Sequence, residues 1–342
     1  MNLDLLEAIR TNLLAPPALF FALGLLAALV KSDLKFPEPL YVAMTIYLLA
    51  AIGFKGGVSM AEAGLATLWL PLLAALLLGA VIPLWCYPIL RHVGRFSAVD
   101  AASVAAHYGS VSAVTFTVAV NFLEEVRLPF EPYAAAFLAV MESPAIIVGI
   151  LLGKLALARG LAAQRPAAGV RRAEPLGATL RQALHEALFG RSVLLLVGTL
   201  LIGFACGKRG LESTAGFFVV PFHGVLALFL LELGTVAGRR LGELRKVGLF
   251  LLAFGIVMPL LHAFVGVMVG GAVGLSAGGA MLLGTLAASA SYIAAPAAMR
   301  LSLPEANPTL SLTAALAITF PFNVMLGIPL CFAFTERWFA GR

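Results

Sequence analysis

A long apolar segment of this chain is interrupted by His107-Tyr108-Gly109-Ser110-Val111-Ser112-Ala113-Val114-Thr115-Phe116. A second apolar segment is interrupted 180 residues later, counted from position 107 to position 287, by Ala287-Ala288-Ser289-Ala290-Ser291-Tyr292-Ile293-Ala294-Ala295-Pro296. Small and hydroxyl residues take the place of large apolar ones in both stretches. Backbone groups released from a helix inside a bilayer must find partners within the protein or in a water-filled cavity. The two stretches therefore predict two discontinuous membrane helices.

The composition around these stretches is that of a membrane protein. Hydrophobic residues make up 61% of the 342 residues and charged residues 12%, whereas a soluble domain carries about 25% charged residues. The apolar segments are continuous and about as long as the ~20 residues that a membrane helix needs, unlike the short alternating strands of a β-barrel. We predict an all-α integral membrane protein with ten transmembrane helices, at 11–30, 38–54, 64–90, 97–123, 131–157, 189–207, 218–237, 246–273, 277–299 and 309–335.

The basic residues are distributed unequally between the two sets of loops that ten spans create. Lys154, Arg239, Arg240 and Arg300 belong to the richer set, which the positive-inside rule places in the cytoplasm. The sequence thus predicts a multi-pass protein of the cell (inner or plasma) membrane with both termini outside the cytoplasm. Residues 158–187 form a cytoplasmic linker in this topology. The net charge of +6 comes from loop residues and gives no indication of nucleic-acid binding.

The two halves that flank this linker resemble each other weakly. Residues 47–57 resemble 229–238, residues 148–152 resemble 326–330, and the interrupted segments fall in the same order between these pairs. Each half has an odd number of spans, so the second half enters the membrane inverted. This is the inverted-repeat plan of secondary transporters, whose discontinuous helices form the binding site. We predict two inverted five-helix repeats with two crossed discontinuous helices.

The contents of the interruptions favour a small anion. If a helix restarts near Ser110, its first N–H groups are unsatisfied and form the positive end of the helix dipole. The hydroxyls of Ser110 and Ser112 add donors, and Ser289 and Ser291 offer the same from the second interruption. The alternative is that these serines only hydrogen-bond to their own helix backbones.

A carboxylate lies inside the fifth predicted span. Glu142 is next to Ser143-Pro144, and Thr319 and Asn323 flank Pro321 in the last span. A carboxylate, hydroxyls and carbonyls freed by proline form a set of oxygen ligands suited to a sodium ion. Glu142 as a hydrogen-bonded structural acid is the alternative. Neither interruption contains Lys or Arg, so a bound anion would depend on helix dipoles and a co-bound cation. Each ion would then raise the affinity of the other.

Three motifs resemble one family. The stretch 107–116, Ile52-Gly-Phe-Lys-Gly-Gly57 and Ile318-Thr-Phe-Pro-Phe-Asn323 look like the SbtA family of sodium-dependent bicarbonate transporters. The resemblance implies ten spans in the fold shared with sodium/proton antiporters and bile-acid sodium symporters, a core and a gate domain, a homotrimer and a PII-like cytoplasmic regulator. It places substrate binding on Gly109, Ser110, Val111, Ser112, Ala113 and Thr115, which Ser289 and Ser291 complete. It places sodium binding nearby, on Ser110, Glu142, Thr319 and Asn323.

These observations predict a sodium-coupled symporter that imports bicarbonate by alternating access, and not an enzyme. The gate domain is predicted at 1–60 and 188–243 and the core domain at 61–157 and 244–338. Alternatives are a sodium symporter for another small anion, a sodium/proton antiporter, a channel and a sensor that works through its linker. An antiporter on this fold would want a mid-membrane aspartate or a pair of acids at the crossing, and neither interruption contains one.

Overall fold

The computed structural model describes residues 5–63, 65–163, 185 and 189–341, and every regular element in these ranges is helical. The predicted linker 158–187 lies largely outside the described residues. The first half contains α1 (Leu5–Leu14), α2 (Pro16–Leu29), α3 (Glu38–Ala63), α4 (Leu65–Pro88), η1 (Ile89–Val93), α5 (Ala98–Gly109), α6 (Ala113–Glu125), η2 (Pro132–Ala134) and α7 (Ala135–Ala163).

The second half is also built from long helices. It contains α9 (Arg191–Phe218), α10 (Phe222–Arg240), η3 (Leu241–Glu243), α11 (Leu244–Ala272), α12 (Ala277–Ala288), α13 (Ala294–Ser302), α14 (Pro308–Leu312), η4 (Thr313–Thr319), α15 (Phe320–Phe322), η5 (Asn323–Gly327) and α16 (Ile328–Ala340). The last five elements form one long helix whose η4 and η5 segments are π-helical. Positive φ angles at Gly207 and Gly248 bend α9 and α11 near one end of their predicted spans.

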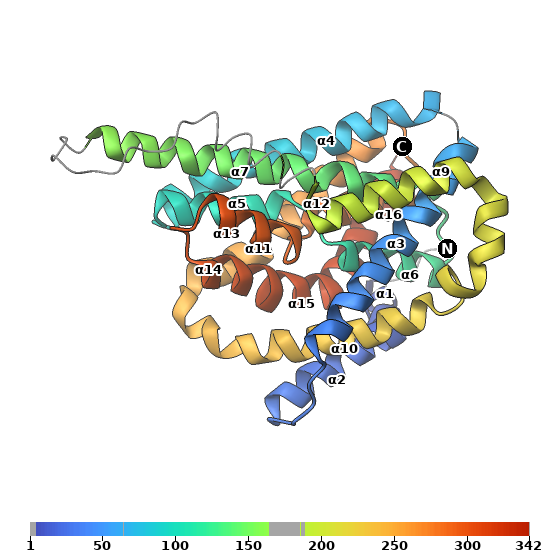
Figure 1. Cartoon of the computed structure of the whole chain (residues 1–342), viewed down its shortest axis with the longest axis horizontal. Coiled ribbons are helices and arrows are strands. Elements are labelled where there is room, and N and C mark those ends of the chain that lie inside the picture. Colours follow the sequence, from blue (N-terminus) through green and yellow to red (C-terminus); the bar gives the residue numbers. More distant parts are fainter. Residues whose placement is uncertain (1–4, 64, 164–184, 186–188, 342) are drawn as a thin grey trace.

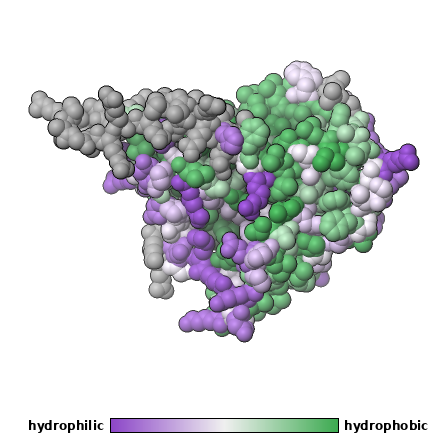
Figure 2. Space-filling view, viewed as in Figure 1, coloured by the Kyte–Doolittle hydropathy of each residue, from purple (hydrophilic) through white to green (hydrophobic). Residues whose placement is uncertain are grey.

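Eight of the described helices are long and apolar enough to cross a bilayer, and the pair α1–α2, bent by 67°, makes a ninth if it counts as one span. The helix α12 is apolar but shorter. Large apolar side chains such as Leu201, Phe217 and Leu249 are more than half exposed, which water would penalise and lipid would not. Apolar residues cover much of the right-hand part of the face in Figure 2, and most hydrophilic residues lie in a band from its left side to its lower edge. The prediction of a multi-pass, all-α membrane protein is confirmed.

Two helix pairs make unusually close contacts through glycine. The helix α2 packs against α10, and α3 packs against α9. A Cβ atom at Gly24 would meet the carbonyl of Leu231, and a Cβ atom at Gly234 would meet the carbonyl of Phe21. The second pair has the same reciprocal arrangement between Gly57 and Leu200 and between Gly203 and Phe54. Small residues permit such close backbone approach within a membrane.

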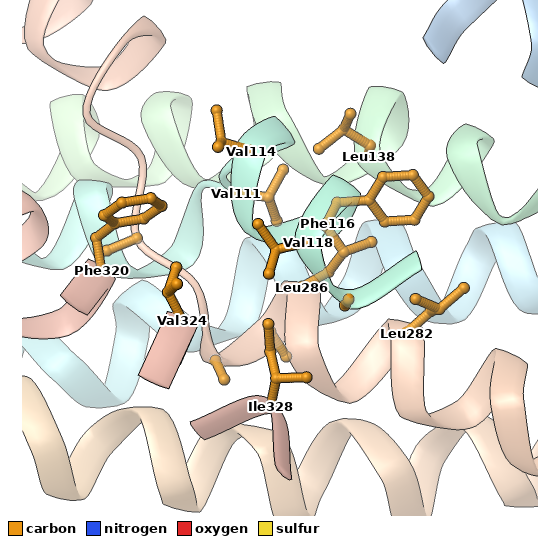
Figure 3. Packing of buried hydrophobic residues seen from close by; sticks show 14 of the residues in the cluster. Val111, Val114, Phe116, Val118, Leu138, Leu282, Leu286, Phe320, Val324 and Ile328 are labelled. Carbon is orange, nitrogen blue, oxygen red and sulfur yellow. The ribbon is translucent and has the colours of Figure 1, made fainter. Parts of the chain in front are cut away.

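The interrupted helices lie among the remaining long helices. The helices α4 and α7 run side by side along the long axis and contact α5 (Figure 1), while α11 contacts α12 and the last helix. Figure 3 shows Val111, from the first interruption, in the same apolar cluster as Leu286 and Phe320. The Val111 side chain is 4% exposed. It therefore belongs to the core, and only its backbone remains for the predicted role in substrate binding.

Hydrogen bonds join the first turn of each interrupted helix to the start of a helix in the other half of the chain. They connect α5 to the start of α14, and α12 to the segment just before α7. Asp100 accepts hydrogen bonds from the Ser97 hydroxyl at 2.7 Å and from the N–H of Asn307, the N-cap of α14, at 2.7 Å. Glu131, just before η2 and α7, accepts from the N–H and the hydroxyl of Ser276, the N-cap of α12, at 2.6 and 3.0 Å. Both carboxylates thus hold the position of a helix N-terminus.

Candidate functional site at the crossing of two interrupted helices

The first interruption lies between α5 and α6. The helix α5 ends at Gly109, where a Cβ atom would collide with Pro83 and Ala145. Ser110 is the C-cap of α5, and Ser112 is the N-cap of α6, its hydroxyl accepting from the Thr115 N–H at 3.2 Å. The helix therefore restarts at Ala113, later than the restart predicted near Ser110, because Ser112 and not Ser110 satisfies the first turn.

The second interruption has a similar design. The helix α12 ends at Ala288 with Ser289 as its C-cap, and α13 begins at Ala294. The Ser291 hydroxyl accepts from the Ala295 N–H at 3.2 Å. Pro296 lies in the first turn of α13, where its missing N–H leaves no hydrogen bond unmade.

The two interruptions are hydrogen-bonded to each other. The Ser112 N–H donates to the Ser289 hydroxyl at 2.9 Å, and the Ser291 N–H donates to the His107 carbonyl at 2.8 Å. The Ser112 hydroxyl donates to the Tyr292 hydroxyl at 3.3 Å. All of these side chains are buried. The N–H groups of Ser112 and Ser291, which lie outside the helices, thus find their partners within the protein, as the bilayer requires.

Several predicted hydroxyls are already committed to backbone carbonyls. Ser110 donates to the carbonyl of Glu142 at 3.1 Å, and Ser289 donates to the carbonyl of Leu286 at 2.8 Å. The alternative interpretation, that the serines bond to backbone, therefore holds in part for these two hydroxyls. Neither hydroxyl is a free donor at the start of α6.

The unsatisfied donors lie one residue further on. In the described part of the chain, the N–H groups of Ala113 and Val114 have no acceptor, because the bonds of the first turn begin with the donors of Thr115 and Phe116. Both residues line a narrow gap of about 10 Å³ against Leu48 and Phe229. Ile293, the N-cap of α13, lines the same gap. The positive ends of two half-helices therefore border one space.

The predicted sodium ligands are not one hydrogen-bonded cluster. The Thr319 hydroxyl donates to the Gly255 carbonyl at 2.8 Å and accepts from the Tyr108 hydroxyl at 2.7 Å. Asn323 donates through Nδ2 to the Ala288 carbonyl at 2.8 Å, at the end of α12. The Glu142 side chain is 6% exposed. Among the described residues, no hydrogen bond joins its carboxylate to Thr319 or Asn323, although its carbonyl holds Ser110.

Two tyrosines that were not predicted from the sequence belong to the site. Tyr292 bonds to Ser112, and its ring packs edge-on against Phe320 at 5.2 Å between centroids. Tyr108 bonds to Thr319 and packs against Phe254 at 4.9 Å. The available signal was the presence of one tyrosine in each small-residue interruption, which is an unusual place for a large polar aromatic side chain.

Larger cavities lie near the narrow gap. One, of about 640 Å³, reaches Tyr292 and Ile293 and is lined by the basic residues Arg191, Arg240 and Arg300. Another, of about 210 Å³, is lined by Thr117, Phe116 and residues that include Lys55 and Glu124. Thr117 lines both the smaller cavity and the gap, and Ile293 lines both the gap and the larger cavity. The gap therefore adjoins both cavities.

These features define a polytopic membrane protein in which two interrupted helices meet at hydrogen-bonded breaks. Residues 16–336 match the model of the Na⁺-dependent bicarbonate transporter superfamily. The chain belongs to this superfamily, which confirms the family predicted from the three motifs. A search of curated protein sequences gives no match to the chain.

Proposed function

We propose that this protein is a sodium-coupled symporter that imports bicarbonate across the cell membrane by alternating access. The observation that carries the proposal is the pair of N–H groups, of Ala113 and Val114, that have no acceptor among the described residues. Both residues line a gap that has no Lys or Arg in its lining. Such a helix end suits a small anion. The superfamily indicates which anion and which coupling ion to test first.

Sodium would compensate the charge of a carboxylate that has no partner among the described residues. Glu142 is buried within α7, and a buried carboxylate without a partner is costly unless a cation or proton joins it. The Asn323 Nδ2 is used by Ala288, which leaves the amide oxygen as a potential ligand. We assign sodium binding to Ser110, Glu142, Thr319 and Asn323. Substrate binding is assigned to the backbone from Gly109 to Val114, with Thr115, Ser289 and Ser291 around it.

The ten-span inverted repeat is part of the proposal. The pair α1–α2 would be the first span and the pair α12–α13 the ninth. Support comes from the matched glycine crossings, in which Gly24 corresponds to Gly203 and Gly57 to Gly234. The reciprocal roles of Asp100 and Glu131 follow the same pseudo-two-fold relation.

The packing suggests one change to the predicted domains. We assign α2, α3, α9 and α10 to the gate and the helices around the interruptions to the core. The helix α1 contacts α16, and Asn12 donates to the carbonyl of Val324 at 2.5 Å. We therefore move α1 from the predicted gate, 1–60, to the core. The predicted homotrimer and PII-like regulator stay as further proposals.

Alternating access is supported by the unequal cavities between these two groups of helices. The larger one, about 640 Å³, lies at the end rich in arginine, and the smaller one is about 210 Å³. If arginine marks the cytoplasmic end, the state described here is open inward. The apolar residues Leu48, Leu49 and Phe229 line the gap between the cavities and would close it toward the outside.

A sodium/proton antiporter remains the alternative, and the position of the acids argues against it. The sequence contains Asp4, Asp33 and Asp100 as its only aspartates. Asp100 lies in the first turn of α5, bonded to Ser97 and Asn307, away from the interruptions. The crossing therefore lacks the aspartate that proton exchange on this fold would want.

The test is uptake of ¹⁴C-bicarbonate into proteoliposomes with and without an inward sodium gradient. We expect uptake above the equilibrium level only with the gradient. Uptake that ignores sodium, or no uptake, would remove the symport proposal. Release of protons driven by sodium would establish the antiporter instead. Liposomes without protein and liposomes with a collapsed gradient are the controls.

A further inference from the structure

A further cavity, distinct from the two described above, is lined in part by α5, the helix that ends at the first interruption. It measures about 120 Å³ and is lined by residues of α5, α13, α14 and the loop between the last two, among them Ser103, His107, Pro296, Arg300 and Ser311. It shares no lining residue with the narrow gap where the transported anion is placed. It shares Pro296 and Arg300 with the cavity of about 640 Å³. The helix α13 thus contributes to the walls of both cavities.

His107, one of the lining residues, has an unmet hydrogen bond in its side chain. His107 is fully buried, and its Nδ1 lies 2.7 Å from the carbonyl of Ser103. A carbonyl only accepts, so Nδ1 carries the proton and Nε2 of the neutral ring is an acceptor. Nε2 has no partner among the described residues. A buried acceptor without a donor costs free energy, so a donor from outside the protein chain is expected here.

A cation lines the same cavity. The guanidinium of Arg300, in the last turn of α13, forms no ion pair with any carboxylate in the described ranges. The remaining lining is mostly apolar, with Met299, Leu303 and Pro304 among it. The cavity therefore combines one unmet acceptor, one unpaired positive charge and an apolar wall.

Few ligands satisfy both groups. Water donates to Nε2 but brings no charge, chloride and nitrate bring charge but no proton, and sodium is repelled by Arg300. A hydrogencarbonate-type anion has an O–H to donate and two oxygens that a guanidinium binds well. The volume of about 120 Å³ compares with ~30 Å³ for one water in the liquid, so a trigonal oxyanion fits with room for water.

We propose that this cavity is a second binding site for a singly protonated oxyanion of the hydrogencarbonate class. The ligand donates to Nε2 of His107 and places its negative oxygens on Arg300. The His107 carbonyl accepts from the Ser291 N–H at 2.8 Å, so the residue that holds the second anion also holds the second interruption. Binding of an anion at this site is expected to change the arrangement of the two interruptions relative to each other.

A regulatory consequence follows, and it rests on the proposed symport. Arg300 also lines the larger cavity, which is the release side in the proposed inward-open state. Anion that accumulates on that side fills the second site and slows further import. The binding itself does not depend on symport and is testable alone.

The experiment measures equilibrium binding of ¹⁴C-hydrogencarbonate to the purified full-length chain in detergent with sodium present. We expect two hydrogencarbonate ions to bind per chain, one in the gap and one in the cavity beside His107. Nitrate should displace at most the ion in the gap. Arg300→Gln and His107→Phe each lower the affinity of one equivalent by about tenfold or more, because each removes a charge-assisted or otherwise unmet bond. Arg337→Gln, at an exposed arginine in the last turn of α16, is the control and keeps two equivalents.

Two outcomes overturn the proposal. One equivalent in the unchanged protein and in Arg300→Gln means that the cavity holds water only, and nitrate displacing both equivalents means that the O–H is not recognised. Arg300 is exposed, so its variant serves even if His107→Phe does not fold. If the unchanged protein binds only one hydrogencarbonate per chain but still shows sodium-driven uptake, the second site is refuted and the proposed function stands.

Discussion

The backbone N–H of Ser112 donates to the hydroxyl of Ser289 at 2.9 Å, joining the start of α6 to the end of α12. The same hydroxyl donates to the carbonyl of Leu286 at 2.8 Å. An orphan donor from one half-helix is thereby linked to a carbonyl in the last turn of the other. Because opposite ends of two helix dipoles meet at this point, the interruption of each helix is stabilised by the interruption of the other.

Removing the Ser289 hydroxyl tests this link. In Ser289→Ala, the Ser112 N–H loses its acceptor inside the protein, which costs about 1–3 kcal/mol for a buried group. We expect a lower unfolding temperature and weaker bicarbonate uptake. Ser213→Ala is the matched control, because that exposed serine on α9 also bonds to a carbonyl of its own helix, at 2.8 Å. Equal behaviour of the two variants would show that the link is dispensable.

Tyr292 is predicted to orient the N-cap of α6. Tyr292→Phe keeps the ring against Phe320 and removes the hydroxyl that accepts from Ser112 at 3.3 Å. Losing one such bond costs about 0.5–1.5 kcal/mol, so the KM for bicarbonate should rise by roughly 2–10-fold. Tyr47→Phe loses a comparable bond to the carbonyl of Phe217, at 2.6 Å on the proposed gate. Kinetics of uptake for both variants should show a raised KM in Tyr292→Phe alone.

The glycine crossing between α3 and α9 should be intolerant of a single methyl group. In Gly57→Ala, the new Cβ would meet the carbonyl of Leu200 and force the helices apart. Gly198→Ala, also in a helix of this pair, places its Cβ where nothing lies within 4 Å. Forced overpacking costs about 1–3 kcal/mol, so Gly57→Ala should unfold at a distinctly lower temperature. A similar unfolding temperature for both variants would contradict the close approach.

The carboxylates of Asp100 and Glu131 should contribute independently to stability. Each holds a helix N-terminus of the opposite half, and losing such a cap costs about 1 kcal/mol. The effects of Asp100→Ala and Glu131→Ala should add to within about 0.5 kcal/mol, because the two residues share no partner. Denaturant unfolding of the single and double variants measures this. Glu125→Ala is the control, since that exposed carboxylate only accepts from Asn121, at 3.1 Å within α6.

The position of the interruptions could be predicted from the sequence, because they are local properties of composition. Both breaks, between Gly109 and Ala113 and between Ala288 and Ala294, fall inside the stretches of small and hydroxyl residues. Several predicted span boundaries lie within a few residues of a helix end, because apolar length is read directly from the chain. The predicted ends at 54 and 207 are wrong, since α3 continues to Ala63 and α9 to Phe218. The motif that carries the family resemblance is also local, and the superfamily match covers 16–336.

The partners of the site residues could not be predicted, because they come from elements far apart in the chain. Nothing near Ser110 in sequence indicates that its hydroxyl is used by the carbonyl of Glu142. The resemblance between residues 47–57 and 229–238 can be aligned with either Gly53 or Gly57 against Gly234, and the proposed inverted repeat requires the second, because Gly57 and Gly234 take matching places in the two glycine crossings. A shift of one helical turn hardly changes the match between apolar helices, so only packing distinguishes the two registers.

The last prediction concerns which cavity is open in the resting protein. Ala297 lines the larger cavity and Ser59 the smaller one, so Ala297→Cys and Ser59→Cys report on the two sides. Cys206 is exposed and must first be replaced, whereas Cys86 and Cys331 are buried. With neither sodium nor bicarbonate present, an impermeant maleimide should label Ala297→Cys quickly from the arginine-rich side and Ser59→Cys slowly from the other. If the two ligands shift the protein toward the outward-open state, labelling of Ser59→Cys should accelerate as labelling of Ala297→Cys slows. In the proposed mechanism, one movement of the core past the gate opens one cavity and closes the other. Rates that change independently, or that ligands leave unchanged, would contradict alternating access between these cavities.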